Sequence, residues 1–263
     1  MTVQGNPILH SNDGDILFLP FGKHIDLWQY TVMTRFMFFA LVSAILVFAA
    51  FAAYVAMQRR YGYSKGPFFN ALEAMLIYVR NDVAIPAIGK KDADRFLPLL
   101  WTIFFFILTC NLMGMLPWLG SPTGAIAFNG AIAICVFLIV HGCGIKENGV
   151  KHYAESFVPD VPWWVKPVLV PIELLSHLIR PFTLAFRLFV NMLAGHTVLF
   201  VFLSFVAVAA SLESYWLQTL IPGGSVLANV LLSFLELLVA FIQAYVFTFL
   251  TALYIGGALH PAH

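Results

Sequence analysis

The chain has 263 residues, of which 61% are hydrophobic and 10% are charged, and its net charge at neutral pH is +1. Soluble domains carry about 25% charged residues, so this composition excludes an ordinary soluble domain and predicts an integral membrane protein. The near-zero net charge gives no support to a nucleic-acid partner or an acidic substrate.

The first 34 residues are polar and mixed in charge, and the first hydrophobic segment starts only at Phe36. A cleavable signal peptide has its apolar region much closer to the N-terminus, so none is expected. An Arg-rich, acid-poor transit peptide is also not expected, which favours a bacterial or organelle-encoded protein.

A helix needs about 20 apolar residues to cross a bilayer. Three such helices are predicted within residues 35–145, at 36–57, 96–119 and 125–145. Segment 146–165 follows, and its amphipathic part with two tryptophans, 149–165, predicts an element at the inner membrane interface. Two longer apolar stretches, 166–210 and 225–259, complete one all-α, polytopic membrane domain over residues 1–263 with about five membrane helices. Residues 211–215 and 222–224 are expected to separate these two stretches.

The stretch 166–210 is too long for a simple crossing. About 45 helical residues measure roughly 68 Å, whereas the hydrocarbon core is about 30 Å thick. One possibility is a single steeply tilted or bent helix, with bend points at Pro167, Pro171 and Pro181. The other is a short interfacial helix, a break and an ordinary span, and the residues alone leave both open.

Lysine and arginine in the loops predict the orientation. Loop 58–95 has seven of them and segment 146–166 has three, whereas loops 118–124 and 211–225 have none. The N-terminus is therefore predicted to lie outside and the C-terminus inside.

Polar residues recur inside the apolar stretches. At 100° per residue, one helix face collects Glu173, Ser176, His177, Arg180, Leu184, Arg187, Asn191 and Gly195. His196 falls on about the opposite face from Arg187. Glu236 and Gln243 lie seven residues apart and share a face of the last helix, and Asn111 is the polar residue of the second span.

Each of these residues also has a purely structural interpretation. Amides such as Asn111 and Gln243 often form hydrogen bonds between helices. Arg180 and Glu173 can pair with each other near the inner end, and His196 can be a hydrogen-bonded histidine of the helix bundle. Arg187 can form an ion pair with Glu236 or Glu173, although such a pair leaves the rest of the polar face unexplained.

Proton passage is the chemistry that these residues support best. Histidine titrates near neutral pH, and a buried carboxyl group can take up and release protons. Arg187 cannot lose its proton, and a charge at the bilayer centre costs at least about 2.5–3.5 kcal/mol. Titratable groups beside a fixed positive charge indicate a gated ion path.

Three stretches carry a resemblance to a known family: 171–196, 96–117 and 236–245. The first includes Arg180-Pro181, Arg187-Leu188-Phe189, Asn191-Met192 and Ala194-Gly195. Over about residues 70–259 the chain resembles the subunit a family of F-type ATP synthases, the membrane stator beside the rotating c-ring.

The resemblance implies roles for individual residues. Arg187 matches the essential arginine that faces the c-ring carboxylate and separates two aqueous half-channels. The outer half-channel is implied to contain Asn111, Asn191, His196, Glu236 and Gln243. The inner half-channel is implied, less directly, to contain Glu173, Ser176 and Arg180.

The family also implies partners and a location. The last two helices are expected to form a long, steeply tilted hairpin against the c-ring, with b-type peripheral stalk subunits as neighbours and the F1 sector as an indirect partner. The chain is then no enzyme by itself but a part of the proton-transporting ATP synthase. The expected location is the bacterial plasma membrane, with the mitochondrial inner membrane as the alternative.

No cofactor, metal or nucleotide is expected. The chain has no Gly-rich loop followed by Gly-Lys-Ser/Thr, and Cys110, Cys135 and Cys143 form no CxxC pair. Three rival interpretations remain: a stand-alone secondary transporter, although no internal repeat is visible; a structural scaffold; and a sodium-driven form of the same machine.

Overall fold

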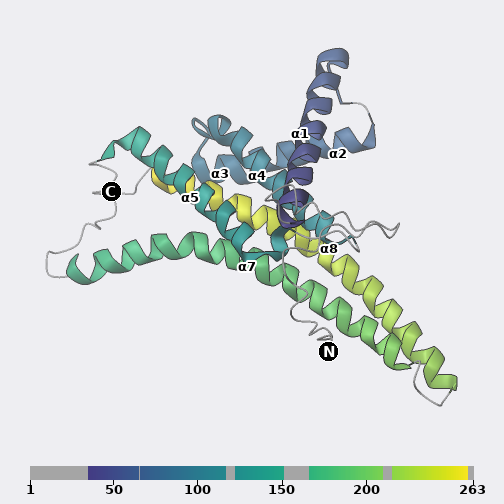
Figure 1. Ribbon diagram of the computed structural model, residues 1–263. Helices are drawn as coiled ribbons and strands as arrows, with labels where there is room; N and C mark the ends of the chain where they lie inside the picture. Colours follow the sequence, from purple (N-terminus) through teal and green to yellow (C-terminus); the bar gives the residue numbers. More distant parts are fainter. Residues whose placement is uncertain (1–34, 65, 117–121, 151–165, 210–214, 260–263) are drawn as a thin grey trace, which may run out of the picture.

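The computed structural model describes residues 35–64, 66–116, 122–150, 166–209 and 215–259, which are almost entirely helical (Figure 1). No strand occurs in this part of the chain. The elements are α1 (Arg35–Tyr61), α2 (Pro67–Tyr78), the π-helix η3 (Val79–Ala84), α3 (Ile85–Ile88), α4 (Ala93–Gly114), the 3-10 turn η4 (Pro122–Gly124), α5 (Ile126–Asn148), α7 (Lys166–Ala209) and α8 (Tyr215–Leu259).

Five helices are long and apolar enough to cross a membrane: α1, α4, α5, and the segments Ile179–Ala209 of α7 and Thr219–Leu259 of α8. The prediction of an all-α polytopic membrane protein is thereby confirmed. The expected inner interfacial element and the polar N-terminal segment lie outside the described residues, apart from Gly149 and Val150.

The basic segment between the first two membrane helices is folded, whereas its sequence predicted only a loop. Pro67 opens α2, where its missing N–H costs nothing. Gly89 ends α3 with a φ of 98°, a backbone conformation that favours glycine. Between them, Leu72, Leu76 and Val79 are buried at helical spacing. This amphipathic α2–η3–α3 segment lies against the membrane helices.

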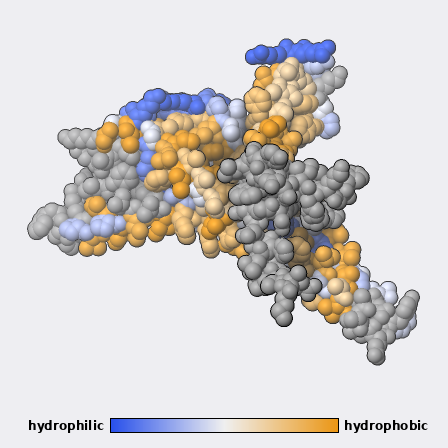
Figure 2. Space-filling view, in the orientation of Figure 1, coloured by the Kyte–Doolittle hydropathy of each residue, from blue (hydrophilic) through white to orange (hydrophobic). Residues whose placement is uncertain are grey.

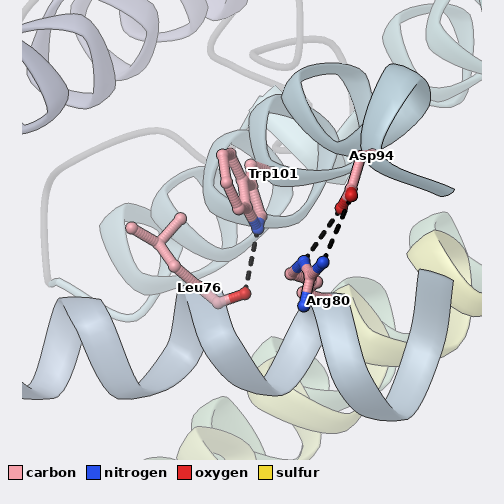
Figure 3. Close-up of polar contacts among 4 residues, drawn as sticks. All are labelled: Leu76, Arg80, Asp94 and Trp101. Carbon is pink, nitrogen blue, oxygen red and sulfur yellow. Dashed lines mark hydrogen bonds and ion pairs between the residues drawn. The ribbon is translucent and has the colours of Figure 1, made fainter. Parts of the chain in front are cut away.

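Two contacts fix that segment on α4 (Figure 3). The indole Nε1 of Trp101 donates a hydrogen bond to the carbonyl oxygen of Leu76 at 3.0 Å. The guanidinium of Arg80 binds both carboxylate oxygens of Asp94, at 2.9 and 3.2 Å. Both partners of the ion pair are exposed, so it contributes little stability. The pair joins the π-helix to the start of α4.

The hydrophobic core lies where η3, α4, α5, α7 and α8 meet. Leu100, Ile107, Phe247 and Ile255 are completely buried there. Gly256 brings α8 into direct contact with the backbone of α3, since a Cβ at this position would overlap the carbonyl oxygen of Ala87. Helix α1 packs on α4 and stands away from this core (Figure 1).

Helices α7 and α8 form a long pair of 44 and 45 residues. They run side by side, and their connected ends project beyond the other helices (Figure 1). Helix α7 is continuous, which selects the single long helix over the broken alternative. The predicted separator at residues 222–224 was wrong, because Pro222 lies inside α8. At about 1.5 Å per residue, each helix measures more than 60 Å.

Polar and apolar residues occupy different parts of the molecular surface. In Figure 2, hydrophilic residues gather at the free tip of α1 and along the edge above α3, α4 and α5, while hydrophobic residues cover the flanks. Large exposed apolar side chains occur on α1, α5, α7 and α8, including Phe48, Leu138, Phe182 and Phe234. Such a surface suits a lipid environment and apolar partner subunits.

Candidate functional site

Arg187 lies on the exposed face of α7. The opposite face of the same helix turns is buried through Leu184, Leu188 and Met192, which are at most 3% exposed. Beside Arg187, the apolar side chains of Phe186 and Val190 are exposed as well. The guanidinium therefore sits in an otherwise apolar outer face of the helix.

Within the described residues, Arg187 has no hydrogen bond or ion pair. The pair with Glu236 that the sequence left open is not formed, since that carboxyl group faces α7 at another position. The side chain of Glu173 is outside the described part of the chain. Among the described residues, the guanidinium is therefore left free to interact with a group outside this part of the chain.

The Glu236 carboxyl group points from α8 to Gly195 of α7. Its Oε1 is buried and has no hydrogen-bond partner among the described residues. A Cβ added at Gly195 would lie 2.5 Å from this oxygen, so a side chain at this position would displace the carboxyl group. The two long helices thus meet at one acid and one residue without a side chain.

A cavity of about 200 Å³ opens beside this contact. Asn191, Gly195 and Glu236 supply its polar lining, and aliphatic side chains such as Leu199, Leu232 and Val239 supply the rest. Its volume accommodates several water molecules, each of which occupies about 30 Å³ in the liquid. The cavity brings together Asn191 and Glu236, two residues for which the family resemblance implies a place on the outer path.

His196 is half-buried and follows Gly195 directly. It lies close enough to Glu236 for the charges of the two groups to interact. An imidazole and a carboxyl group therefore lie near each other at the α7–α8 contact.

Gln243 is 5% exposed, and its Nε2 has no hydrogen-bond partner among the described residues. Asn229, seven residues before Glu236, also has a buried side-chain oxygen without such a partner. Asn229, Glu236 and Gln243 therefore form one polar line along α8. Sequence reasoning missed Asn229, although the same seven-residue spacing would have identified it.

The residues expected on the inner side are only partly described. Ser176 donates its hydroxyl hydrogen to the carbonyl oxygen of Ile172 at 2.9 Å, within its own helix. The guanidinium of Arg180 lies over the ring of Tyr254, 5.1 Å from its centre. The side chain of Glu173 lies outside the described residues. The described contacts of Ser176 and Arg180 are therefore to different partners, and the place of Glu173 on the inner side stays a prediction.

Asn111 lies at the opposite end of α4 from Asp94 and is 3% exposed. Its side-chain oxygen accepts a hydrogen bond from the Thr123 hydroxyl at 2.9 Å. The Asn129 amide in turn donates to the Thr123 carbonyl oxygen at 2.7 Å. Sequence reasoning singled out Asn111 but missed Thr123 and Asn129, because short polar residues near a helix start are typical of turns and caps.

Comparison with known proteins gives matches over most of the chain. Residues 37–256 match the family model described as ATP synthase A chain. The ATP synthase subunit a of Myxococcus xanthus is 39% identical over 199 residues, 76% of this chain and 63% of that protein. The ATP synthase subunit a 2 of Chlorobaculum tepidum is 34% identical over 263 residues, 97% and 73% of the two chains.

A third relative is the ATP synthase subunit a of Rhodopseudomonas palustris, which is 37% identical over 225 residues, 84% of this chain and 88% of that protein. These relatives differ in length, so the chain covers a different share of each. The chain spans just under two thirds of the M. xanthus protein and most of the R. palustris protein.

Proposed function

This chain belongs to the ATP synthase A chain family, and we propose that it is the membrane stator subunit that couples proton flow to rotation of a c-ring. The observation that carries the proposal is Arg187: a permanent cation, exposed on an apolar helix face and unpaired within the described residues. Such a charge needs a carboxylate on a partner subunit to compensate it.

The outer half-channel delivers the proton to that partner. The polar side chains of this half-channel are those of Asn111, Asn191, His196, Glu236 and Gln243. The cavity at Glu236 offers room for water within the half-channel. His196 and Glu236 can each take up and release a proton, while the amides hold water in hydrogen-bonding range. The proton then neutralises a carboxylate of the ring, and the neutral carboxyl group can enter the lipid as the ring turns.

Arg187 acts on the ring carboxyl group as it returns. A nearby cation favours the charged form of a carboxyl group, so the proton leaves before the group passes Arg187. The proton departs through the inner half-channel, which contains Glu173, Ser176 and Arg180. Because the guanidinium stays charged, it also blocks a direct proton leak between the half-channels.

The exposed apolar face around Arg187 is the surface that meets the ring. The long, steeply tilted α7–α8 pair gives this surface the length needed to follow a large round partner. The b-type stalk subunits hold the chain in place, and the F1 sector, where ATP is formed, is an indirect partner. We place the complex in the bacterial plasma membrane.

The test is replacement of Arg187 in the assembled complex. Arg187→Ala should abolish ATP synthesis driven by a proton gradient, with the c-ring still copurifying. Arg187→Lys should also uncouple the complex, because an ammonium group lacks the delocalised, permanent charge of the guanidinium. The matched control is Arg59→Ala, which removes an exposed arginine at the end of α1 and should leave synthesis unchanged. Normal synthesis by an assembled Arg187→Ala complex would overturn the proposal.

A further inference from the structure

Three buried polar side chains meet where α4, η4 and α5 come together. Asn111 is 3% exposed, and Thr123 and Asn129 are completely buried. The Thr123 hydroxyl donates to Asn111, and the Asn129 amide donates to the Thr123 carbonyl oxygen, at 2.9 and 2.7 Å. Thr123 therefore holds one asparagine on its side chain and the other on its backbone.

Each asparagine keeps one unused polar atom. Asn111 Nδ2 and Asn129 Oδ1 are buried and have no hydrogen-bond partner among the described residues. The orientation of Asn129 is fixed, because a carbonyl oxygen can only accept and its partner must be the amide nitrogen. Rotating the Asn111 amide by half a turn would exchange its oxygen and nitrogen but still leave one of them unpaired.

The two unused atoms are complementary. Asn111 Nδ2 is a donor and Asn129 Oδ1 is an acceptor, so one water molecule can accept from the first and donate to the second. Buried water commonly makes two to four hydrogen bonds to such otherwise unsatisfied groups. An unsatisfied buried polar group is costly, which favours occupation of this position by water.

The location of this cluster gives the water a role. The start of α4 and the end of α5 are joined by the Arg95–Glu147 ion pair, so Asn111 and Asn129 lie at the opposite end of this helix pair. The loop at their end, residues 118–124, has no lysine or arginine, which predicts the outer side. The turn η4 also packs against α7, the helix that carries Asn191 and His196.

We propose that Asn111, Thr123 and Asn129 form a binding site for a buried water molecule, which relays protons into the outer half-channel. The inference rests on the proposed function and deepens it, since it adds two positioning residues to the outer path. Thr123 orients both amides, and Asn129 supplies the acceptor that holds the water beside Asn111.

A matched pair of substitutions tests the role of the water. Asn129→Ala and Asn129→Ser remove nearly the same volume, but only the serine keeps a hydroxyl group that can bind water in the enlarged space. In the assembled complex, after removal of F1, Asn129→Ala should lower passive proton conduction about tenfold, and Asn129→Ser should retain most of it. Thr248→Val is the control, because the buried Thr248 hydroxyl bonds only within its own helix, to Ala244 at 2.8 Å, and conduction should not change.

The second readout is direct. A high-resolution density map of the assembled wild-type complex should show a water molecule within hydrogen-bonding distance of Asn111 Nδ2 and Asn129 Oδ1. Absence of that density, normal conduction by Asn129→Ala, or equal losses in the alanine and serine variants would overturn this inference. Those results leave the loss of coupling in Arg187→Ala intact, so failure here and failure of the proposed function are distinguishable.

Discussion

Two opposite charges on neighbouring helices stay apart in this structure. Arg187 is exposed on the outer face of α7, and Glu236 points from α8 to Gly195, two turns further along α7. Pairing them would neutralise both charges inside one chain and leave none for a partner. The separation therefore leaves Glu236 available for proton delivery and Arg187 available for the carboxyl group of a partner, as the proposed function requires.

Gly195 sets the space for the Glu236 carboxyl group. Gly195→Ala would place a Cβ 2.5 Å from Oε1, so the carboxyl group would have to leave its position beside the cavity. We expect a several-fold loss of ATP-driven proton pumping in membrane vesicles, because proton transfer depends on the position of the reacting group, here the Glu236 carboxyl group. Adding Glu236→Asp, which shortens the acid, should restore part of the pumping.

Gly223→Ala is the control for that substitution, since a Cβ at Gly223 meets nothing within 4 Å. It should pump protons at the normal rate. Equal pumping by Gly195→Ala and Gly223→Ala would mean that the position of the Glu236 carboxyl group is unimportant.

At the scale of whole elements, the sequence predicted the helices better than their ends. Pro222, Gly223 and Gly224 indicated a break because proline costs about 3 kcal/mol inside a helix in water. In a bilayer, a broken helix would expose backbone groups that lipid cannot satisfy. That cost favours the continuation of α8 through Pro222 and of α7 through Pro181, which both lie within candidate membrane spans.

The helical segment α2–η3–α3 was also missed, although its signal is present in the sequence. Leu72, Leu76, Val79 and Val83 are spaced by four, three and four residues, and all four are buried. The frequent charges of segment 58–95 interrupt this apolar periodicity and are typical of a loop. The π-helix itself has no sequence signal of that kind, and it packs against both α4 and α8.

The contact between α3 and α8 depends on Gly256. A side chain there would overlap the carbonyl oxygen of Ala87, and backbone cannot move aside as a flexible side chain can. Gly256→Ala should therefore destabilise the protein by about 1–3 kcal/mol and lower its thermal unfolding temperature in detergent. Its neighbour provides the control, because Gly257→Ala adds a Cβ with nothing within 4 Å. Equal unfolding temperatures for the two variants would contradict the close packing of α8 on α3.

At the scale of the whole molecule, most of the candidate site could be predicted because polar residues are rare in an apolar chain. Arg187, Glu236 and Gln243 stand out for that reason alone. Asn129 and Thr123 could not be recognised in the same way, since their importance comes from burial between three elements. Composition also does not distinguish the apolar faces that meet lipid from those that meet a partner subunit, because both surroundings are apolar.

The orientation of the whole chain follows from the positions of its charges. Lys90 lies in the basic region beside α3, and Trp216 lies at the start of α8, in the connection without lysine or arginine; both are exposed. In a variant whose three native cysteines are replaced, a membrane-impermeant maleimide should label Trp216→Cys in intact cells but not Lys90→Cys. Inverted vesicles should give the reverse pattern, since the positive-inside rule places the basic region on the cytoplasmic side. Labelling of Lys90→Cys in intact cells would show that the orientation is opposite to the predicted one. The cluster around Asn129 would then lie on the side of the membrane from which protons leave.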